Sequence, residues 1–283
     1  MKMFNKKLII GALIATFTFG LAGSTDTYAA TSPTLGPVGS YSVLGHTTVT
    51  NTGATTMPGD LGISIGGAPV GFPPGSVGPP GTVRNAGDSL AAQNDNTAAF
   101  GTIDQPCTTT YPSGPMDLVG LSLVAGVYCA DAFELSGNLN LTGTGVWIFK
   151  SSATLTTSST ANVIGGDPCS VWWRVSSSAV LGTNTSITGN ILALTSISLQ
   201  TGADLNGRAL AQTGAVTLDN NTITGTECLT TSTFGGAGAA TPGLPNTGLS
   251  TKGSSGILWS VGVVAGLIIT SLTLLVIRNK RVI

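Results

Sequence analysis

Short runs of alternating apolar and polar residues recur at a fixed spacing in the second half of the chain, most clearly over residues 180–226. The unit is polar–apolar–polar–glycine, and it occurs at 186–189, 204–207 and 222–225, with a period of 18 residues. Such a period, built from short β-type runs with Gly, Asn and Thr turns, predicts a β-solenoid with about six residues on each of three sides. Because side chains alternate across a strand, we expect Ile187, Leu205 and Ile223 to stack inside the coil.

The same strand–glycine–strand pattern occurs on the N-terminal side of this stretch. Residues 139–149 follow it, and residues 171–175 take the equivalent place one coil later. Residues 56–61 have the pattern of residues 186–191, so one coil is expected far from the others in sequence. Pro58 cannot donate to a β-ladder, which suits a coil at the end of the stack.

A single helix is expected over residues 82–104. Thr82 can cap its start, and Gln105-Pro106 ends it. Its apolar positions are mostly small, and they comprise Val83, Ala86, Leu90, Ala91, Ala98 and Phe100. We expect this apolar face to lie along one side of the solenoid.

Residues 1–29 have the pattern of a secretory signal peptide. Three lysines precede an apolar run over residues 8–21, and small residues at Thr27 and Ala29 favour cleavage after Ala29. A first transmembrane helix is the alternative, but the apolar run is short for one. The folded domain is therefore expected over residues 30–228.

The C-terminal part of the chain is expected to be a tether and an anchor. Residues 229–243 are rich in Thr, Gly and Ala without hydrophobic periodicity, which predicts a flexible linker. Residues 244–283 then combine three parts: the motif Leu244, Pro245, Asn246, Thr247 and Gly248, an apolar run at 257–277 and a basic end. The apolar run is long enough for a transmembrane helix, and the basic end is expected to stay in the cytoplasm.

These three parts in this order resemble the sorting signal of Gram-positive-type surface proteins. The resemblance implies that a sortase cuts between Thr247 and Gly248 and joins Thr247 to peptidoglycan, after a membrane-inserted stage. A plain C-terminal membrane anchor is the alternative. Either arrangement displays the folded domain outside the cell.

The composition narrows the range of partners. Charged residues make up 8% of the chain, against about a quarter in ordinary domains. Four basic and eleven acidic residues lie between positions 30 and 247, a balance of −7. This argues against nucleic acid or anionic lipid as a partner of the folded part. His46 is the only histidine, which removes histidine-based triads and multi-histidine metal sites, and we expect no metal or cofactor.

Four cysteines in an exported chain suggest two disulfides. Sequence alone allows three connectivities. We favour Cys107–Cys129 and Cys169–Cys228, the second of which would tie down the last coil. Zinc ligation is the alternative, although none of these cysteines has the close pair spacing of a zinc site.

Seven segments of the chain carry a resemblance to a known family. They are residues 59–62, 71–75, 126–128, 169–173, 193–203, 206–211 and 214–219. Together they resemble the microbial ice-binding-like (antifreeze) β-solenoid family, over about residues 35–228. The resemblance implies a mostly β fold, namely a discontinuous right-handed three-sided β-solenoid with one long helix packed alongside. In family members that bind ice, one flat side rich in Thr and other small residues makes the contact.

The outward positions beside the stacked apolar residues are the candidates for such a side. The candidate ice-binding residues are Asn140, Thr142, Ser186, Thr188, Asn206, Thr222 and Thr224. Rungs about 4.8 Å apart, with outward neighbours about 6.8 Å apart, form a grid that can order water. Asp204 and Pro58 interrupt this grid. The alternative is that Thr, Ser and Asn are simply good strand and turn formers on any solenoid.

Our leading hypothesis is therefore a monomeric, surface-anchored protein that binds ice. The alternative is a general adhesin or wall-coat protein that has the fold without ice affinity. Trp172 and Trp173 are interpreted as packing residues rather than sugar-binding platforms. A pectin-cleaving enzyme would need converging carboxylates, but Asp204 and Asp219 fall at different places in the coil, so we do not expect catalysis.

Overall fold

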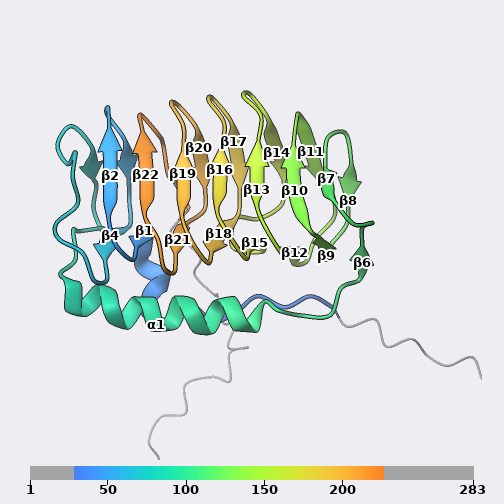
Figure 1. The fold of residues 1–283 in the computed structure, drawn as a ribbon, viewed down its shortest axis with the longest axis horizontal. Helices are drawn as coiled ribbons and strands as arrows, with labels where there is room; N and C mark the ends of the chain where they lie inside the picture. Colours follow the sequence, from blue (N-terminus) through green and yellow to red (C-terminus); the bar gives the residue numbers. More distant parts are fainter. Residues whose placement is uncertain (1–28, 226–283) are drawn as a thin grey trace, which may run out of the picture. The chain divides into compact units, whose positions relative to one another are not determined.

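The computed structural model describes residues 29–225, which form a stack of β-coils with one helix alongside (Figure 1). Contacts divide the chain into two units, Met1–Thr230 and Thr231–Ile283, and the described residues all belong to the first. The predicted signal peptide up to residue 28, the linker, the sorting motif and the transmembrane helix lie outside the described residues. Among residues 29–225, no helix has the length and apolar character needed to cross a membrane.

Three parallel sheets form the three sides of the solenoid. The eight-stranded sheet has the order β4 (Asp60–Ile63), β1 (Tyr41–Gly45), β21 (Ala209–Ala211), β18 (Asn190–Ala193), β15 (Val171–Val175), β12 (Trp147–Ser151), β9 (Gly126–Ala130) and β6 (Thr109–Thr110). The seven-stranded sheet has the order β2 (Val49–Thr52), β22 (Val216–Asp219), β19 (Ile197–Leu199), β16 (Ala179–Leu181), β13 (Leu155–Thr157), β10 (Ala132–Leu135) and β7 (Pro115–Asp117). The five-stranded sheet has the order β20 (Asp204–Asn206), β17 (Ser186–Thr188), β14 (Asn162–Gly165), β11 (Asn138–Leu141) and β8 (Ser122–Leu123). A small sheet pairs β3 (Thr56–Met57) with β5 (Ser76–Val77).

The coil predicted near the N-terminus is present, and it is stacked on the last coil of the repeat. Strand β1 pairs with β21, and β2 pairs with β22, in spite of more than 160 intervening residues. Thr56 continues the contact by bridging Thr222. The β-solenoid fold is thus confirmed, including its discontinuity in sequence.

The 18-residue repeat sets the core in the predicted way. Ile187 pairs with Leu205, Leu205 bridges Ile223, and each is at most 1% exposed. The repeated glycine after each unit is required by close packing at the corner. A methyl group on Gly207 would lie 1.9 Å from the carbonyl oxygen of Gly189, and one on Gly225 would lie 2.3 Å from the backbone nitrogen of Gly207.

Aromatic rings fill the interior where the coils are wider. Phe149 stacks on Trp173 with 4.2 Å between ring centroids, and on Tyr128 with 5.5 Å. Trp172 points to the outer side of β15, where it is buried and its Nε1 donates to the Ser32 hydroxyl. The interpretation of Trp172 and Trp173 as packing residues is confirmed.

The helix is present, but its boundaries and its buried face differ from the prediction. Helix α1 spans Ala86–Thr102 and is capped by Asn85, whose side chain accepts from the backbone N–H of Asp88. Thr82 does not cap it, because residues 82–84 run along the edge of β4: the Thr82 N–H donates to Asp60, and Val83 bridges Leu61. The start predicted at residue 82 is therefore four residues too early.

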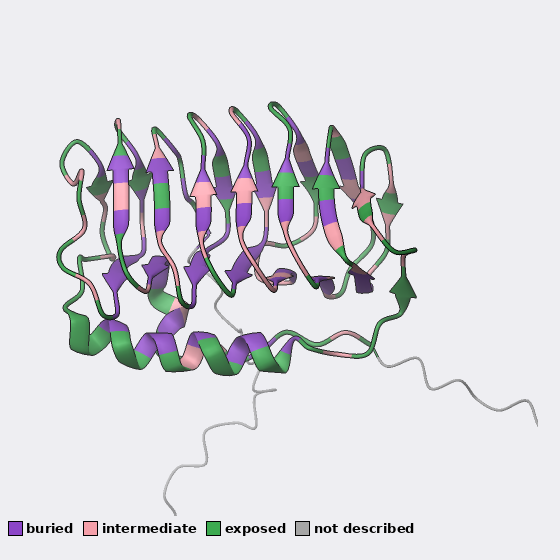
Figure 2. Ribbon diagram, viewed as in Figure 1, coloured by how far each residue is buried: buried purple, intermediate pink, exposed green. Residues whose placement is uncertain are grey.

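The helix buries one face along its length (Figure 2), and half of the buried residues are polar. Its buried residues are Ser89, Ala92, Gln93, Asn96, Ala99 and Phe100, whereas five of the six predicted positions (Val83, Ala86, Leu90, Ala91 and Ala98) are exposed. Gln93 donates from its side chain to the carbonyl groups of Ala211 and Gln212 at the end of β21. The prediction failed because the helix docks partly through hydrogen bonds to strand ends rather than through an apolar stripe.

The disulfide between Cys107 and Cys129 is confirmed. Cys169 is also disulfide-bonded. Its predicted partner, Cys228, lies outside the described residues.

Candidate functional site

One of the three sides is not available as a contact surface. Helix α1 and the segment before β1 cover the outer side of the eight-stranded sheet, and they bury Leu44, Leu192 and Leu210 from its strands. Arg208 is buried there as well, and it donates to the carbonyl of Gly39 and to the Asn190 side chain. Burial lowers the pKa of Arg208 to about 10, so the group remains charged at neutral pH. We call this side the helix-covered face.

The five-stranded face is exposed and carries most of the residues predicted to bind ice. Ser186 pairs with Asp204, and Thr188 pairs with Asn206, side by side on adjacent strands. Thr222 and Thr224 follow in the next coil. The Thr222 backbone N–H donates to Asp204 at 2.9 Å, and the Thr224 hydroxyl donates to the Asn206 side chain at 3.1 Å. These residues therefore form two outward columns.

Of Asn140 and Thr142, which were expected to continue the two columns, only Asn140 falls in one of them. Asn162 pairs both with Asn138 and with Ser186, so Asn138 and Asn162 extend the Ser186 column. Asn140 pairs with Ile164 and falls in the column of Thr188 instead. Thr142 is exposed but lies beyond the end of β11. The error arises because Thr142-Gly143 resembles the Thr-Gly of the repeat, whereas the register puts Leu141 opposite Gly165, so Gly143 lies two residues beyond the place of the repeat's glycine.

The five-stranded face is chemically irregular. Asp204 places a carboxylate in one column, and the side chain of Ile164 is 50% exposed in the other. Asn162 and Asn138 bond to each other through their side chains. Between β14 and β17 only one pair of residues is in register, Asn162 with Ser186. The ladder of paired strands is therefore weakest near the middle of this face.

The seven-stranded face is exposed and has an uninterrupted ladder. One outward column runs through the centre of its strands, in register from end to end: Thr50, Thr217, Ser198, Val180, Thr156, Glu134 and Asp117. The residues two positions earlier form a second column of small side chains, Thr48, Ala215, Ser196, Ser178, Thr154, Ala132 and Pro115. Acidic residues occupy only the last two places of the first column.

Hydrogen bonds from a neighbouring residue fix the Asp117 carboxylate at that end of the column. Asp117 accepts from the hydroxyl and the backbone N–H of Ser136. Burial acts to raise the pKa of Asp117, but these hydrogen bonds outweigh it, and the pKa lies below its usual value. Asp117 is therefore ionised at neutral pH, and the uncharged part of the column ends at Thr156, before Glu134 and Asp117.

Sequence analysis did not single out the seven-stranded face. Its strands lack the repeated glycine that marked the other side, and the spacing from Thr156 to Val180, Ser198 and Thr217 changes from 24 to 18 to 19 residues. The sequence feature that indicates this face is the alternation of side chains, with one small polar residue between two apolar ones in 197–199 and 216–218.

The described residues do not bring the two candidate carboxylates together. Asp204 lies in β20 on the five-stranded face, and Asp219 ends β22 on the seven-stranded face. Asp219 accepts instead from the Thr201 hydroxyl at the corner between these faces. The two carboxylates therefore lie on different faces of the solenoid.

Comparison with known proteins agrees with this architecture. Residues 43–224 match the family described as Ice-binding-like. An ice-binding protein of Nostoc sp. (strain HG1) is 40% identical over 233 residues, which cover 79% of this chain and 84% of that protein. The crystal structure of an ice-binding protein from the Antarctic ascomycete Antarctomyces psychrotrophicus has a TM-score of 0.64 and 37% identity, and the match covers 69% of this chain and 98% of that one.

A crystal structure of an ice-binding protein from an Antarctic biological consortium matches with a TM-score of 0.64 and 36% identity, over 70% of this chain and 93% of that one. The sequence match, the relatives and the stacked β-coils all agree. This chain belongs to the ice-binding-like family.

Proposed function

We propose that this protein binds ice through one exposed flat side of its solenoid. The observation that carries the proposal is the seven-stranded ladder, on which short side chains recur in register on a rigid backbone. Short hydroxyl and methyl groups on parallel strands lie on a regular grid of about 4.8 Å between rungs. Such a grid can hold an ordered layer of water, and a layer of that kind can merge with an ice lattice. The relatives named above are ice-binding proteins, which supports the same function here.

The seven-stranded face fits this role better than the five-stranded face. It has more strands, its ladder has no break, and its two columns are uncharged over most of their length. The five-stranded face holds the residues expected from the sequence, but Asp204 and Ile164 interrupt it. We therefore place the ice contact on the seven-stranded face and keep the columns of Thr188 and Thr224 as the alternative position.

Matched substitutions on the two faces test this assignment. Ser198→Tyr and Thr156→Tyr each place a bulky ring on the seven-stranded face, and Thr188→Tyr and Thr224→Tyr do the same on the other. Thermal hysteresis, ice-crystal shape and recrystallisation are measured for each variant, with its melting temperature as the folding control. We expect Ser198→Tyr and Thr156→Tyr to abolish ice activity, and the other two to leave it unchanged.

Two other outcomes would contradict this assignment or the function itself. Loss of activity only in Thr188→Tyr and Thr224→Tyr would move the contact to the five-stranded face. If the unmodified protein neither shapes ice nor inhibits recrystallisation, ice binding is wrong, and the adhesin or wall-coat alternative takes its place.

We further propose that the protein acts from the cell surface, joined to peptidoglycan by a sortase. The supporting features are the predicted signal peptide and the motif over residues 244–248 with its apolar run and basic end. The position of the last described residue is compatible with a tether. Gly225 packs against Gly207 at the edge between the five-stranded and helix-covered faces, which is opposite the seven-stranded face.

Cell fractionation tests the anchor. Protein released from cells only by a wall-hydrolysing enzyme, and not by detergent, is the expected result, and Thr247→Ala should shift it to the membrane fraction. Detergent extraction of the unmodified protein would instead support a plain membrane anchor.

A further inference from the structure

The outward column of the seven-stranded face changes character within a single rung. From β2 to β13 its members are short and uncharged: Thr50, Thr217, Ser198, Val180 and Thr156. In the next strand, β10, Glu134 lies directly beside Thr156 in the register, and adjacent strands are about 4.8 Å apart. A long acidic side chain therefore stands next to the last short one.

Glu134 is the only outward residue of β10 that departs from the pattern of this face. Phe133 and Leu135 are each 1% exposed and point into the coil, so Ala132 and Glu134 point outward. Ala132 belongs to the second column and is as small as the other members of that column. A short side chain at position 134 would therefore continue both columns through β10.

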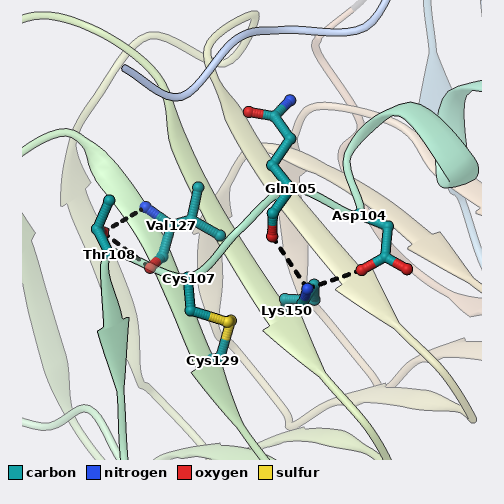
Figure 3. The surroundings of a disulfide bond; sticks show 7 residues. All are labelled: Asp104, Gln105, Cys107, Thr108, Val127, Cys129 and Lys150. Atoms are coloured by element: carbon teal, nitrogen blue, oxygen red, sulfur yellow. Dashed lines mark hydrogen bonds and ion pairs between the residues drawn. A yellow bond between two sulfur atoms is a disulfide. The ribbon is translucent and has the colours of Figure 1, made fainter. Parts of the chain in front are cut away.

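No positive charge neutralises the Glu134 carboxylate. None of the seven strands of this face contains a lysine or an arginine. Lys150 and Arg174 lie in the eight-stranded sheet, where both bond to Asp104. Figure 3 shows Lys150 directed toward Asp104 and the carbonyl of Gln105. Glu134 forms no ion pair or side-chain hydrogen bond with another described residue, so its carboxylate is solvated by water alone.

The next acid along the column, Asp117, is bound by the protein instead. Its carboxylate accepts from the hydroxyl and the backbone N–H of Ser136, and from the backbone N–H of Val119. Asp117 and Glu134 are in register on adjacent strands, and like charges in such positions repel each other. Because its donors fix Asp117, the repulsion favours extension of the Glu134 side chain into solvent.

An extended carboxylate is incompatible with an ice contact at this rung. Ice is a solid, and it cannot deform around a side chain that stands above its short neighbours. Within the contact the carboxylate would lose its water shell without gaining a cation or a donor. That loss costs more than one hydroxyl–water hydrogen bond contributes. Contact is therefore favourable up to Thr156 and unfavourable at Glu134.

We propose that Glu134 ends the ice contact, which covers the five strands from β2 to β13 and excludes β10 and β7. The inference rests on the proposed ice-binding function and adds the residue that limits the size of the contact. Removal of this one carboxylate should enlarge the contact.

The substitution Glu134→Thr in the full-length protein tests the boundary. It introduces the short hydroxyl side chain found at Thr156, and threonine is favoured in strands. We expect thermal hysteresis at equal protein concentration to rise by at least about 1.2-fold, because the contact grows from five strands to six. Asp204→Thr is the matched control, since it removes an exposed acid from a strand of the five-stranded face, and it should leave hysteresis unchanged.

Ser198→Glu is the reverse experiment. It places an unpaired carboxylate at the centre of the column, and we expect it to lose most of the thermal hysteresis. The melting temperature of each variant is the folding control, and Glu134→Ser replaces Glu134→Thr if the latter lowers the melting temperature. Full activity in Ser198→Glu would show that the contact tolerates a carboxylate, and the role of Glu134 would then be wrong.

The remaining outcomes separate this inference from the function on which it rests. If Ser198→Tyr abolishes ice activity but Glu134→Thr gives no rise, the boundary is wrong while ice binding by this face stands. An equal rise in Glu134→Thr and Asp204→Thr would indicate an effect of net charge and would overturn the assignment to Glu134. An unmodified protein without ice activity refutes the proposed function itself.

Discussion

The Asp60 carboxylate is the clearest single point at which the N-terminal coil can be loosened. Its side chain is 2% exposed. It accepts from the Ser40 hydroxyl at 2.7 Å, from the Thr82 backbone N–H at 2.9 Å and from Arg84 at 2.8 Å. One carboxylate thus links β4 to the segment before β1 and to the segment before the helix.

The substitution Asp60→Asn keeps the size of the side chain but removes its charge and one acceptor. Arg84 is 40% exposed, so we count only the bonds from Ser40 and Thr82. Hydrogen bonds to a charged group contribute about 1.5–3 kcal/mol each. Because the amide oxygen can still accept from Thr82, only the bond from Ser40 is lost, and we expect a loss of about 1.5–3 kcal/mol in the free energy of unfolding.

The pH dependence gives the sharper test. Burial acts to raise the pKa of Asp60, but the bonds from Arg84, Ser40 and Thr82 outweigh it and hold the pKa below its usual value. A carboxyl with a lowered pKa in the folded state stabilises the fold above its unfolded pKa of about 3.9, and this stability is lost as the pH falls through the folded pKa. The difference between wild type and Asp60→Asn should therefore be full at neutral pH and shrink below about pH 4.

Urea unfolding at neutral and acidic pH measures both quantities. Asp88→Asn is the matched control, because Asp88 is an exposed acid in the first turn of the helix, and its loss should cost less than about 1 kcal/mol. If Asp60→Asn costs no more than Asp88→Asn, or if the difference is the same at both pH values, the assigned role of Asp60 is wrong.

Two further predictions concern the core and the disulfide. Leu205→Ala should lower the free energy of unfolding by about 3–5 kcal/mol, because the side chain is fully buried between two coils; the partly exposed Leu194→Ala should cost far less, and similar losses in chemical denaturation would contradict the stacking. Reduction of Cys107–Cys129 opens a loop of 22 residues, so the Cys107→Ala/Cys129→Ala variant should lose about 3 kcal/mol; a melting temperature equal to that of the oxidised protein would refute this.

The parts of the fold that follow a strict repeat could be predicted from the sequence. Ile187, Leu205 and Ile223 were placed correctly because an 18-residue period and strand alternation together fix which side faces inward. The distant N-terminal coil was also found, because residues 56–61 keep the same pattern. In these places local propensity and tertiary packing agree.

The errors occur where packing departs from the local pattern. The buried face of α1 includes Ser89, Gln93 and Asn96, and a method that looks for an apolar stripe selects the opposite side. The column positions of Asn140 and Thr142 failed because Gly143 lies two residues beyond the place of the repeat's glycine, and pair register is not visible in one sequence. That the helix lies along one side of the solenoid was expected from the sequence, but which side it covers follows only from the three-dimensional arrangement.

The pairing of β1 and β2 with β21 and β22 sets an order for assembly. During synthesis, the strands of the N-terminal coil emerge first, whereas the strands of the repeat with which they pair, β21 and β22, emerge last. The intervening coils can stack on one another as they appear, because each pairs with its immediate successor. The first coil can pair with β4 as soon as both have been made, but it cannot dock on the rest of the solenoid until β21 and β22 have emerged.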